Sequence, residues 1–130
     1  MKTVISNVKL VQNGSITPCD IVLDGAEICR ISEPGSEVME GVDGKGLYLS
    51  HGFIDIHCHG GGGADFMDGT EEAWRTAARL HLTHGTTCMT PTTLSATREE
   101  LLRAFEIFYR CRDDIQDGAR MLGLHLEGPY

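Results

Sequence analysis

The feature that most constrains the fold is the alternation, after residue 50, of strand-like stretches with amphipathic helix-like segments. GFIDIHCH at 52–59 is apolar and β-branched enough for a strand, and TTCMTPTT at 86–93 is expected to be the next strand, with Pro91 marking its end. MLGLHL at 121–126 is expected to be a third buried strand, and amphipathic segments separate the three. This order predicts parallel strands covered by helices. A parallel barrel and a doubly wound sheet both satisfy it.

Local signals predict where the helices begin and end. Thr70 can cap a helix that Gly85 can end, and Thr97 with Glu100 has the spacing of a capping box for the second. At helical spacing, the expected packing face of the first helix is Ala73, Trp74, Ala77, Ala78 and His81. The corresponding face of the second helix is Leu101, Leu102, Phe105, Phe108 and Tyr109.

The beginning of the chain has a different character. Residues 1–50 contain short strand-like stretches separated by turn residues, with Asp24-Gly25 as a candidate two-residue hairpin turn. We therefore expect a small all-β domain at 1–50 and an α/β part at 51–130.

Composition narrows the class of protein. The formal net charge of -8, with basic residues mixed among the acidic ones, argues against nucleic acid as a partner. The sequence contains neither a signal-peptide core nor a stretch near the roughly 18 apolar residues that a membrane span needs. Five widely spaced cysteines fit reduced thiols rather than a disulfide framework. We expect a cytoplasmic protein that does not bind membranes.

Two pairs of polar residues at strand ends suggest a metal site. Side chains alternate along a strand, so His57 and His59 are expected on one face of the first strand. His125 and Glu127 share a face of the third strand by the same rule. Parallel α/β folds place their sites at the C-terminal ends of strands, where both pairs lie. Two histidines and one carboxylate is a ligand set of catalytic zinc, which lowers the pKa of a bound water.

Four motifs resemble those of a known family. GFIDIHCHG resembles the first-strand signature of the amidohydrolase superfamily, which comprises metal-dependent hydrolases built on a (β/α)8 barrel. HGGGGADF, GTTCMTPTT and HLEGPY together are similar to the N-acetylglucosamine-6-phosphate deacetylases. The resemblance covers all 130 residues, with His51 in place of the usual Pro and Tyr130 in place of the usual Phe. Neither departure falls on a ligand position.

The resemblance implies a fold and its limits. It implies the N-terminal part of a β-sandwich at 1–50 and, at 51–130, the start of an amidohydrolase-type (β/α)8 barrel. About three strands and two helices make that barrel incomplete, because eight strands are needed for closure. The chain would then be the first third of the enzyme, and we expect it to be inactive alone.

The resemblance also implies a reaction and its residues. The complete enzyme would hydrolyse N-acetyl-D-glucosamine 6-phosphate to glucosamine 6-phosphate and acetate. Glu127 would be the metal ligand common to the family, with His57 and His59 as further ligands in members that keep both histidines. We expect a divalent metal, zinc or iron, as one or two ions, and a homodimer when full length. The proton-transferring aspartate, two more histidine ligands and the phosphate-binding residues would lie beyond residue 130.

Other residues near the motifs have less defined roles. Asp55 and His125 are candidates for supporting the ligands or contacting substrate without being ligands themselves. The glycine run, including Gly61 and Gly62, is either a phosphate-binding nest of backbone N–H groups or, as we favour, a close turn.

Three alternatives remain from the sequence. The complete protein could be another amidohydrolase, such as an isoaspartyl dipeptidase or a dihydroorotase-like enzyme. The chain could instead be a non-catalytic metal-binding fragment. In the third alternative, His57, His59 and Glu127 are structural residues that never meet.

Overall fold

The chain forms two compact units that divide between His51 and Gly52. The structure, a computed structural model, describes residues 2–128, so Tyr130 lies outside the described residues. All five cysteines lie within this range and are free thiols. Within it, neither helix is long and apolar enough to cross a membrane.

The first unit is a five-stranded sheet with the order β3-β2-β1-β4, in which β5 also pairs with β1. The strands are β1 (Lys2–Gln12), β2 (Ser15–Asp24), β3 (Glu27–Ser32), β4 (Gly41–Asp43) and β5 (Tyr48–Leu49). Strands β1, β2 and β3 are antiparallel neighbours, whereas β4 and β5 run parallel to β1. Its buried apolar cluster is formed by Val8, Cys19 and Ile21.

The β2–β3 hairpin is present, but its turn is one residue later than predicted. Asp24 pairs with Glu27, so Gly25 and Ala26 form the two-residue turn. Gly25 has a φ of 60°, a left-handed conformation that favours glycine in such turns. Asp24 extends the strand ladder instead of belonging to the turn.

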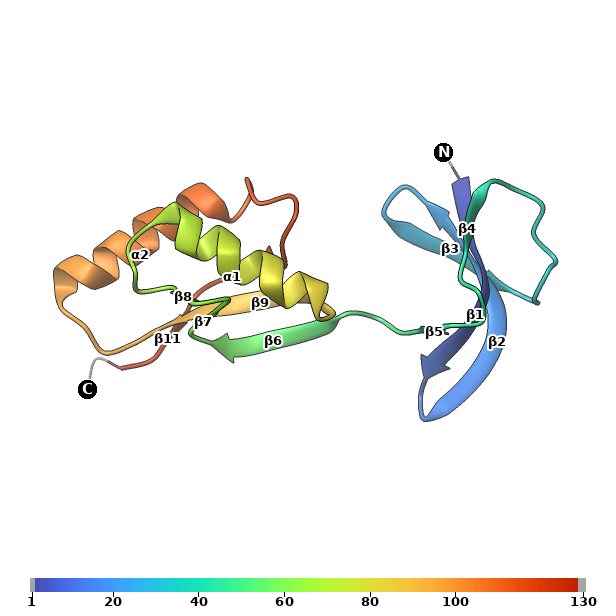
Figure 1. The fold of residues 1–130 in the computed structure, drawn as a ribbon, viewed down its shortest axis with the longest axis horizontal. Helices are drawn as coiled ribbons and strands as arrows, with labels where there is room; N and C mark the ends of the chain where they lie inside the picture. The colour runs from blue at the N-terminus through green and yellow to red at the C-terminus, as the bar shows by residue number, and fades with distance from the viewer. Residues whose placement is uncertain (1, 129–130) are drawn as a thin grey trace. The chain divides into compact units, whose positions relative to one another are not determined.

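The second unit combines short strands with two helices. Its elements are β6 (Phe53–Cys58), β7 (Gly60–Gly61), β8 (Ala64–Asp65), α1 (Glu71–Thr83), β9 (Thr86–Thr93), α2 (Arg98–Cys111), β10 (Arg120–Met121) and β11 (His125–Leu126). Strands β6, β10 and β11 all pair in parallel with β9. Both helices lie on one face of this sheet (Figure 1). The expected parallel strands covered by helices are therefore present.

The predicted third strand is interrupted. Arg120–Met121 pairs with Cys88–Met89, and His125–Leu126 pairs with Thr92–Thr93. From Met121 to His125 the chain advances by one residue more than β9 does between the partners of these two residues. A continuous ladder cannot absorb that extra residue, so one expected strand becomes two short ones.

The predicted helix starts are confirmed. The Thr70 hydroxyl accepts a hydrogen bond from the Ala73 N–H, and Thr97 with Glu100 forms a complete capping box. In α1 the predicted face is buried at Ala73, Trp74, Ala77 and Ala78.

The predicted face of α2 is only partly correct: Phe108 is buried and Leu101 and Phe105 are half-buried. Its buried residues are Ala104, Ile107, Phe108 and Cys111, whereas Leu102 and Tyr109 are exposed. The small side chains of Ala104 and Cys111 pack in the same core as Trp74 of α1. The buried face of α2 therefore lies to one side of the predicted one, because small side chains pack there as well as large ones.

Candidate metal centre

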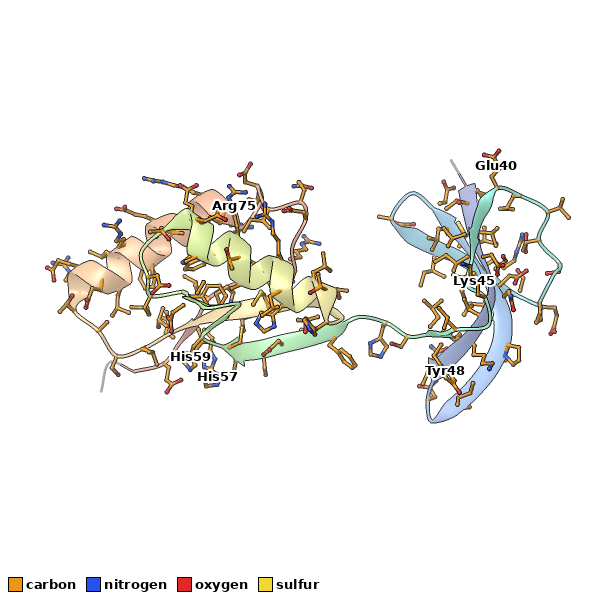
Figure 2. All side chains as sticks on the ribbon, in the orientation of Figure 1. Glu40, Lys45, Tyr48, His57, His59 and Arg75 are labelled. Carbon is orange, nitrogen blue, oxygen red and sulfur yellow. The ribbon has the colours of Figure 1, made fainter. Side chains whose placement is uncertain are left out.

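The site residues lie where two parallel strands end. His57 is the penultimate residue of β6, His59 follows that strand directly, and Glu127 follows β11 directly. In Figure 2, His57 and His59 lie at the end of β6, away from the two helices. Because β6 and β11 both pair in parallel with β9, their C-terminal ends reach the same edge of the sheet.

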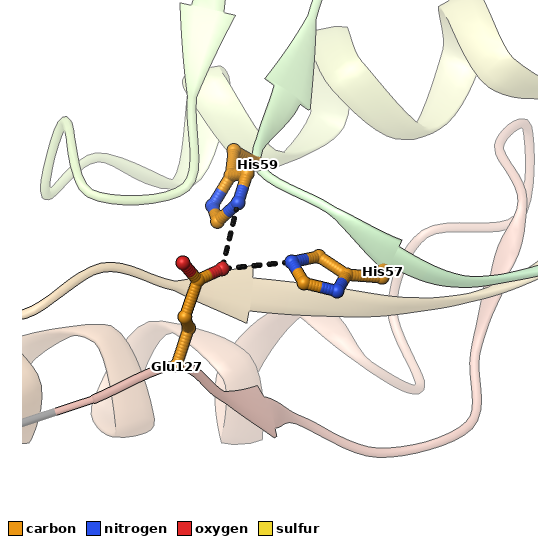
Figure 3. Close-up of side chains that lie close together, drawn as sticks. All are labelled: His57, His59 and Glu127. Atoms are coloured by element: carbon orange, nitrogen blue, oxygen red, sulfur yellow. Dashed lines mark hydrogen bonds and ion pairs between the residues drawn. The ribbon is translucent and has the colours of Figure 1, made fainter.

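The three side chains predicted as ligands converge (Figure 3). Nε2 of His57 lies 2.8 Å from Oε2 of Glu127, and Nε2 of His59 lies 3.1 Å from the same oxygen. One potential ligand atom from each residue lies within 4.8 Å of the others. The imidazole rings are 5.2 Å apart between centroids and nearly perpendicular, so both nitrogens can face one point.

This arrangement fits a divalent metal ion. Zinc bonds of about 2.0 to 2.2 Å in a tetrahedron separate neighbouring ligand atoms by roughly 3.3 to 3.6 Å. The distances from Glu127 Oε2 to the two nitrogens, 2.8 and 3.1 Å, are within a few tenths of an ångström of that range. Small side-chain rotations would therefore admit an ion. Two imidazoles and one carboxylate also leave a coordination position open for water or substrate.

Electrostatics keep the Glu127 carboxylate ionised. Without a bound ion, the hydrogen bond from His57 is the main cause that lowers the pKa of Glu127, and the charges that His59, His57 and His125 carry when protonated lower it further. Partial burial acts in the opposite direction without overcoming them. An ionised carboxylate contributes the negative charge that a divalent cation needs in addition to neutral imidazole ligands.

His125 lies beside the three converging residues without joining them. Its ring is 4.4 Å from the His57 ring, between centroids, in an edge-on arrangement. Its Nδ1 is 3.1 Å from the Ile56 carbonyl oxygen, so this nitrogen carries the proton and donates. Asp55 also acts on the backbone, since its Oδ1 accepts the His57 N–H at 3.0 Å.

The glycine run forms a tight hairpin. Gly60–Gly61 pairs with Ala64–Asp65, and the turn between them consists of Gly62 and Gly63 with φ values of 66° and 81°. A Cβ on Gly61 would lie 2.9 Å from Leu80 Cδ2, so α1 packs closely here. His81, which was expected only on the packing face of α1, also hydrogen-bonds the Gly60 carbonyl through Nε2 at 3.0 Å.

Two threonines near the site were missed by sequence reasoning. Thr90 Oγ1 donates to the Ile56 carbonyl at 2.6 Å, and Thr92 Oγ1 accepts the Cys58 N–H at 3.0 Å. The only signal was their alternation in TTCMTPTT, which places both hydroxyls on the same face of β9.

Known proteins resemble the chain in sequence and structure, although no family model matches it. An N-acetylglucosamine-6-phosphate deacetylase from Vibrio furnissii is 39% identical over 82 residues, covering 63% of this chain and 21% of the relative. The same enzyme from Lysinibacillus sphaericus is 28% identical, covering 100% of this chain and 34% of the relative. A crystal structure of N-acetylglucosamine-6-phosphate deacetylase from Pasteurella multocida matches with a TM-score of 0.87 and 27% identity, over 100% of this chain and 35% of that one.

A different amidohydrolase activity also occurs among the relatives. A dihydroorotase from Staphylococcus aureus is 34% identical, covering 85% of this chain and 26% of the relative. The solved deacetylase from Pasteurella multocida matches the fold along the whole chain, including the β unit and the strand ends that carry the three converging residues. In sequence and in fold, the chain is therefore similar to the N-terminal part of the N-acetylglucosamine-6-phosphate deacetylases, of which it spans about a third.

Proposed function

We propose that this chain provides part of the metal centre of an enzyme that deacetylates N-acetyl-D-glucosamine 6-phosphate. In the reaction, water adds to the acetyl carbonyl and the C–N bond breaks, which releases acetate and glucosamine 6-phosphate. The observation that carries the proposal is the convergence of His57, His59 and Glu127 at the carboxyl ends of parallel strands. The similarity to deacetylases along the whole chain supports the choice of substrate.

Each residue of the centre has a distinct role. His57 and His59 offer neutral nitrogen lone pairs, and Glu127 adds an oxygen ligand with negative charge. A divalent ion held there would polarise the acetyl carbonyl and lower the pKa of a water molecule. The second oxygen of the Glu127 carboxylate, Oε1, would be available as a ligand if the centre held two ions. We propose zinc or iron, as one or two ions.

Protonation of the departing amine and binding of the phosphate require residues other than His57, His59 and Glu127. The departing amine needs an acid to protonate it, and we assign that role to an aspartate beyond residue 130. We expect the phosphate-binding groups there as well. The 130 residues alone should therefore show no turnover above a metal-only control. A homodimer and a cytoplasmic location for the complete enzyme also belong to this proposal.

Hydrolysis of a cyclic amide is the second candidate, because a dihydroorotase is similar over most of the chain. Both reactions cleave an amide C–N bond and both suit a site of this composition. They differ in substrate, since one leaving group is an amino-sugar phosphate and the other remains tethered in the opened ring. Substrate assays therefore separate the two candidates directly.

The test is acetate release from N-acetylglucosamine 6-phosphate by the whole gene product. We expect turnover that a chelator abolishes and that added zinc or iron restores. Ring opening of dihydroorotate should be undetectable under the same conditions. Chelator-sensitive dihydroorotate hydrolysis without acetate release would replace the deacetylase proposal by the second candidate. Activity that survives complete metal removal would contradict the metal centre.

A further inference from the structure

Strand β6 contains an irregularity immediately before the metal centre. Asp55 pairs with Met89 and Cys58 pairs with Pro91. Two residues, Ile56 and His57, therefore lie opposite the single residue Thr90. An extra residue in one strand is a β-bulge, which interrupts the ladder and changes the direction of the side chains that follow.

Side chains replace the ladder at this bulge. The Ile56 carbonyl accepts from Thr90 Oγ1 at 2.6 Å and from His125 Nδ1 at 3.1 Å. The His57 N–H donates to Asp55 Oδ1, and the Cys58 N–H donates to Thr92 Oγ1, both at 3.0 Å. These four bonds give backbone groups at the bulge partners that depend on the bulged geometry, so they favour the bulged conformation over a regular one.

The two donors to the Ile56 carbonyl come from different strands. Thr90 belongs to β9, which pairs with β6 directly. His125 belongs to β11, which pairs with β9 and continues into Glu127. The bond from His125 therefore ties the strand that presents Glu127 to the residue that precedes His57.

We propose that Thr90 and His125 are positioning residues, which together clamp the Ile56 carbonyl and thereby aim His57 and His59 at Glu127. This inference rests on the proposed metal centre, because it assigns a purpose to the bulge beside those ligands. Without the clamp, β6 can relax toward a regular ladder. The residues after Asp55 would then shift by one position against β9, which would turn His57 and His59 away from the face of the sheet that carries His125 and Glu127. Neither residue has to touch the metal or the substrate.

The test is metal affinity in the whole gene product, measured by competition with a chromophoric chelator for zinc. Thr90→Val keeps the β-branched shape but removes the donor, and we expect zinc binding to weaken about 10-fold or more, as for other groups that orient ligands. Thr90→Ser restores a hydroxyl and should bind zinc nearly as the parent does. Thr87→Val is the matched control, since Thr87 is an exposed residue of the same strand opposite no ligand.

A separate pair of variants tests the second donor, His125. His125→Leu removes the bond, whereas His125→Asn places an amide N–H near the position of Nδ1. We expect loss of zinc affinity in the first and partial recovery in the second. Thermal unfolding of each metal-free variant identifies any substitution that prevents folding. If the variants of one donor do not fold, the zinc affinities of the folded variants of the other donor decide the outcome.

A measurement without any substitution completes the test. Nitrogen-15 NMR of the parent should find the His125 proton on Nδ1, because the Ile56 carbonyl can only accept. A proton held on Nε2 alone overturns the clamp. Unchanged zinc affinity in both Thr90→Val and His125→Leu also overturns it while leaving the proposed function intact. A parent protein that binds no divalent ion overturns the proposed function and the clamp together.

Discussion

Nε2 of His57 lies 2.8 Å from Oε2 of Glu127, although 70 residues separate the two in the chain. Strand β9 lies between the segments that carry them, pairing with β6 and with β11. The contact therefore depends on the parallel order of the sheet. Replacing either residue should affect the metal centre more than the fold, because both side chains are about half exposed.

Glu127→Gln should lower both the metal content and kcat of the complete enzyme. The substitution removes the negative charge while nearly keeping the shape, so an ion loses its only charged ligand among the three residues. Loss of several kcal/mol of transition-state stabilisation corresponds to a rate decrease on the order of 10²-fold or more. Metal stoichiometry and steady-state kinetics check this prediction. Glu106→Gln, on the exposed face of α2, is the matched control. Full metal content and a near-normal rate in Glu127→Gln would show that Glu127 is not the principal ligand.

His59→Asn should be less harmful than Glu127→Gln. It leaves the contact between His57 and Glu127 in place, so an ion would keep one nitrogen ligand and the charged oxygen ligand. We expect fewer ions per chain together with appreciable remaining activity. The two variants are compared by metal analysis and kinetics in the same buffer. A greater loss of rate in His59→Asn than in Glu127→Gln would reverse the assigned importance of these ligands.

Gly60→Ala should disturb the hairpin next to His59. The added Cβ would lie 2.1 Å from the Ala64 carbonyl oxygen, a backbone atom that cannot move aside without breaking the β7–β8 pairing. We expect a lower melting temperature and weaker metal binding. Gly63→Ala provides the comparison, because its Cβ meets nothing within 4 Å and incurs only the cost of a left-handed φ, about 1 to 2 kcal/mol. Equal effects of the two substitutions would argue against the steric explanation.

The capping box of α2 should make stability depend on pH. Hydrogen bonds from the Thr97 N–H and then from its hydroxyl lower the pKa of Glu100 below its usual 4.5. A lowered pKa in the folded state means that the stabilisation is fully present above about pH 4.5. It is lost as the pH falls through the lower folded-state value.

Chemical denaturation at several pH values measures this effect in Glu100→Gln. The difference in unfolding free energy from the parent should shrink as the solution becomes acidic. Glu99→Gln is the control, because Glu99 lies in the same first turn outside the capping box. Thr97→Ala should cost about 1 kcal/mol at neutral pH. A pH dependence as large in Glu99→Gln as in Glu100→Gln would assign the effect to the helix dipole instead.

The helix ends could be predicted because their causes are local. Thr70 and Thr97 lie within three residues of the N–H groups that they cap, so neighbouring residues alone specify the geometry. The packing face of α2 could not be predicted in the same way. Ala104 and Cys111 are buried because α1 brings Trp74 into the same core, and helical spacing alone allows more than one apolar stripe.

The metal centre could likewise be predicted only in part from the local sequence. Alternation along the strand predicted that His57 and His59 would act together, and both nitrogens do face Glu127. The bulge between Asp55 and Cys58 was not predictable, because it depends on the register against β9. His59 also lies just beyond β6, where strict alternation no longer applies.

The sequence by itself determined the order of strands and helices and the positions of the helix caps, because each depends on neighbours within a few positions. Only the tertiary structure decided that the Ile56 carbonyl would receive both Thr90 and His125, and that the third strand would break before His125. Those outcomes depend on how strands far apart in the chain match residue for residue across β9. A single extra residue in one strand shifts the register between the two strands. The local sequence of neither strand specifies where that shift will occur.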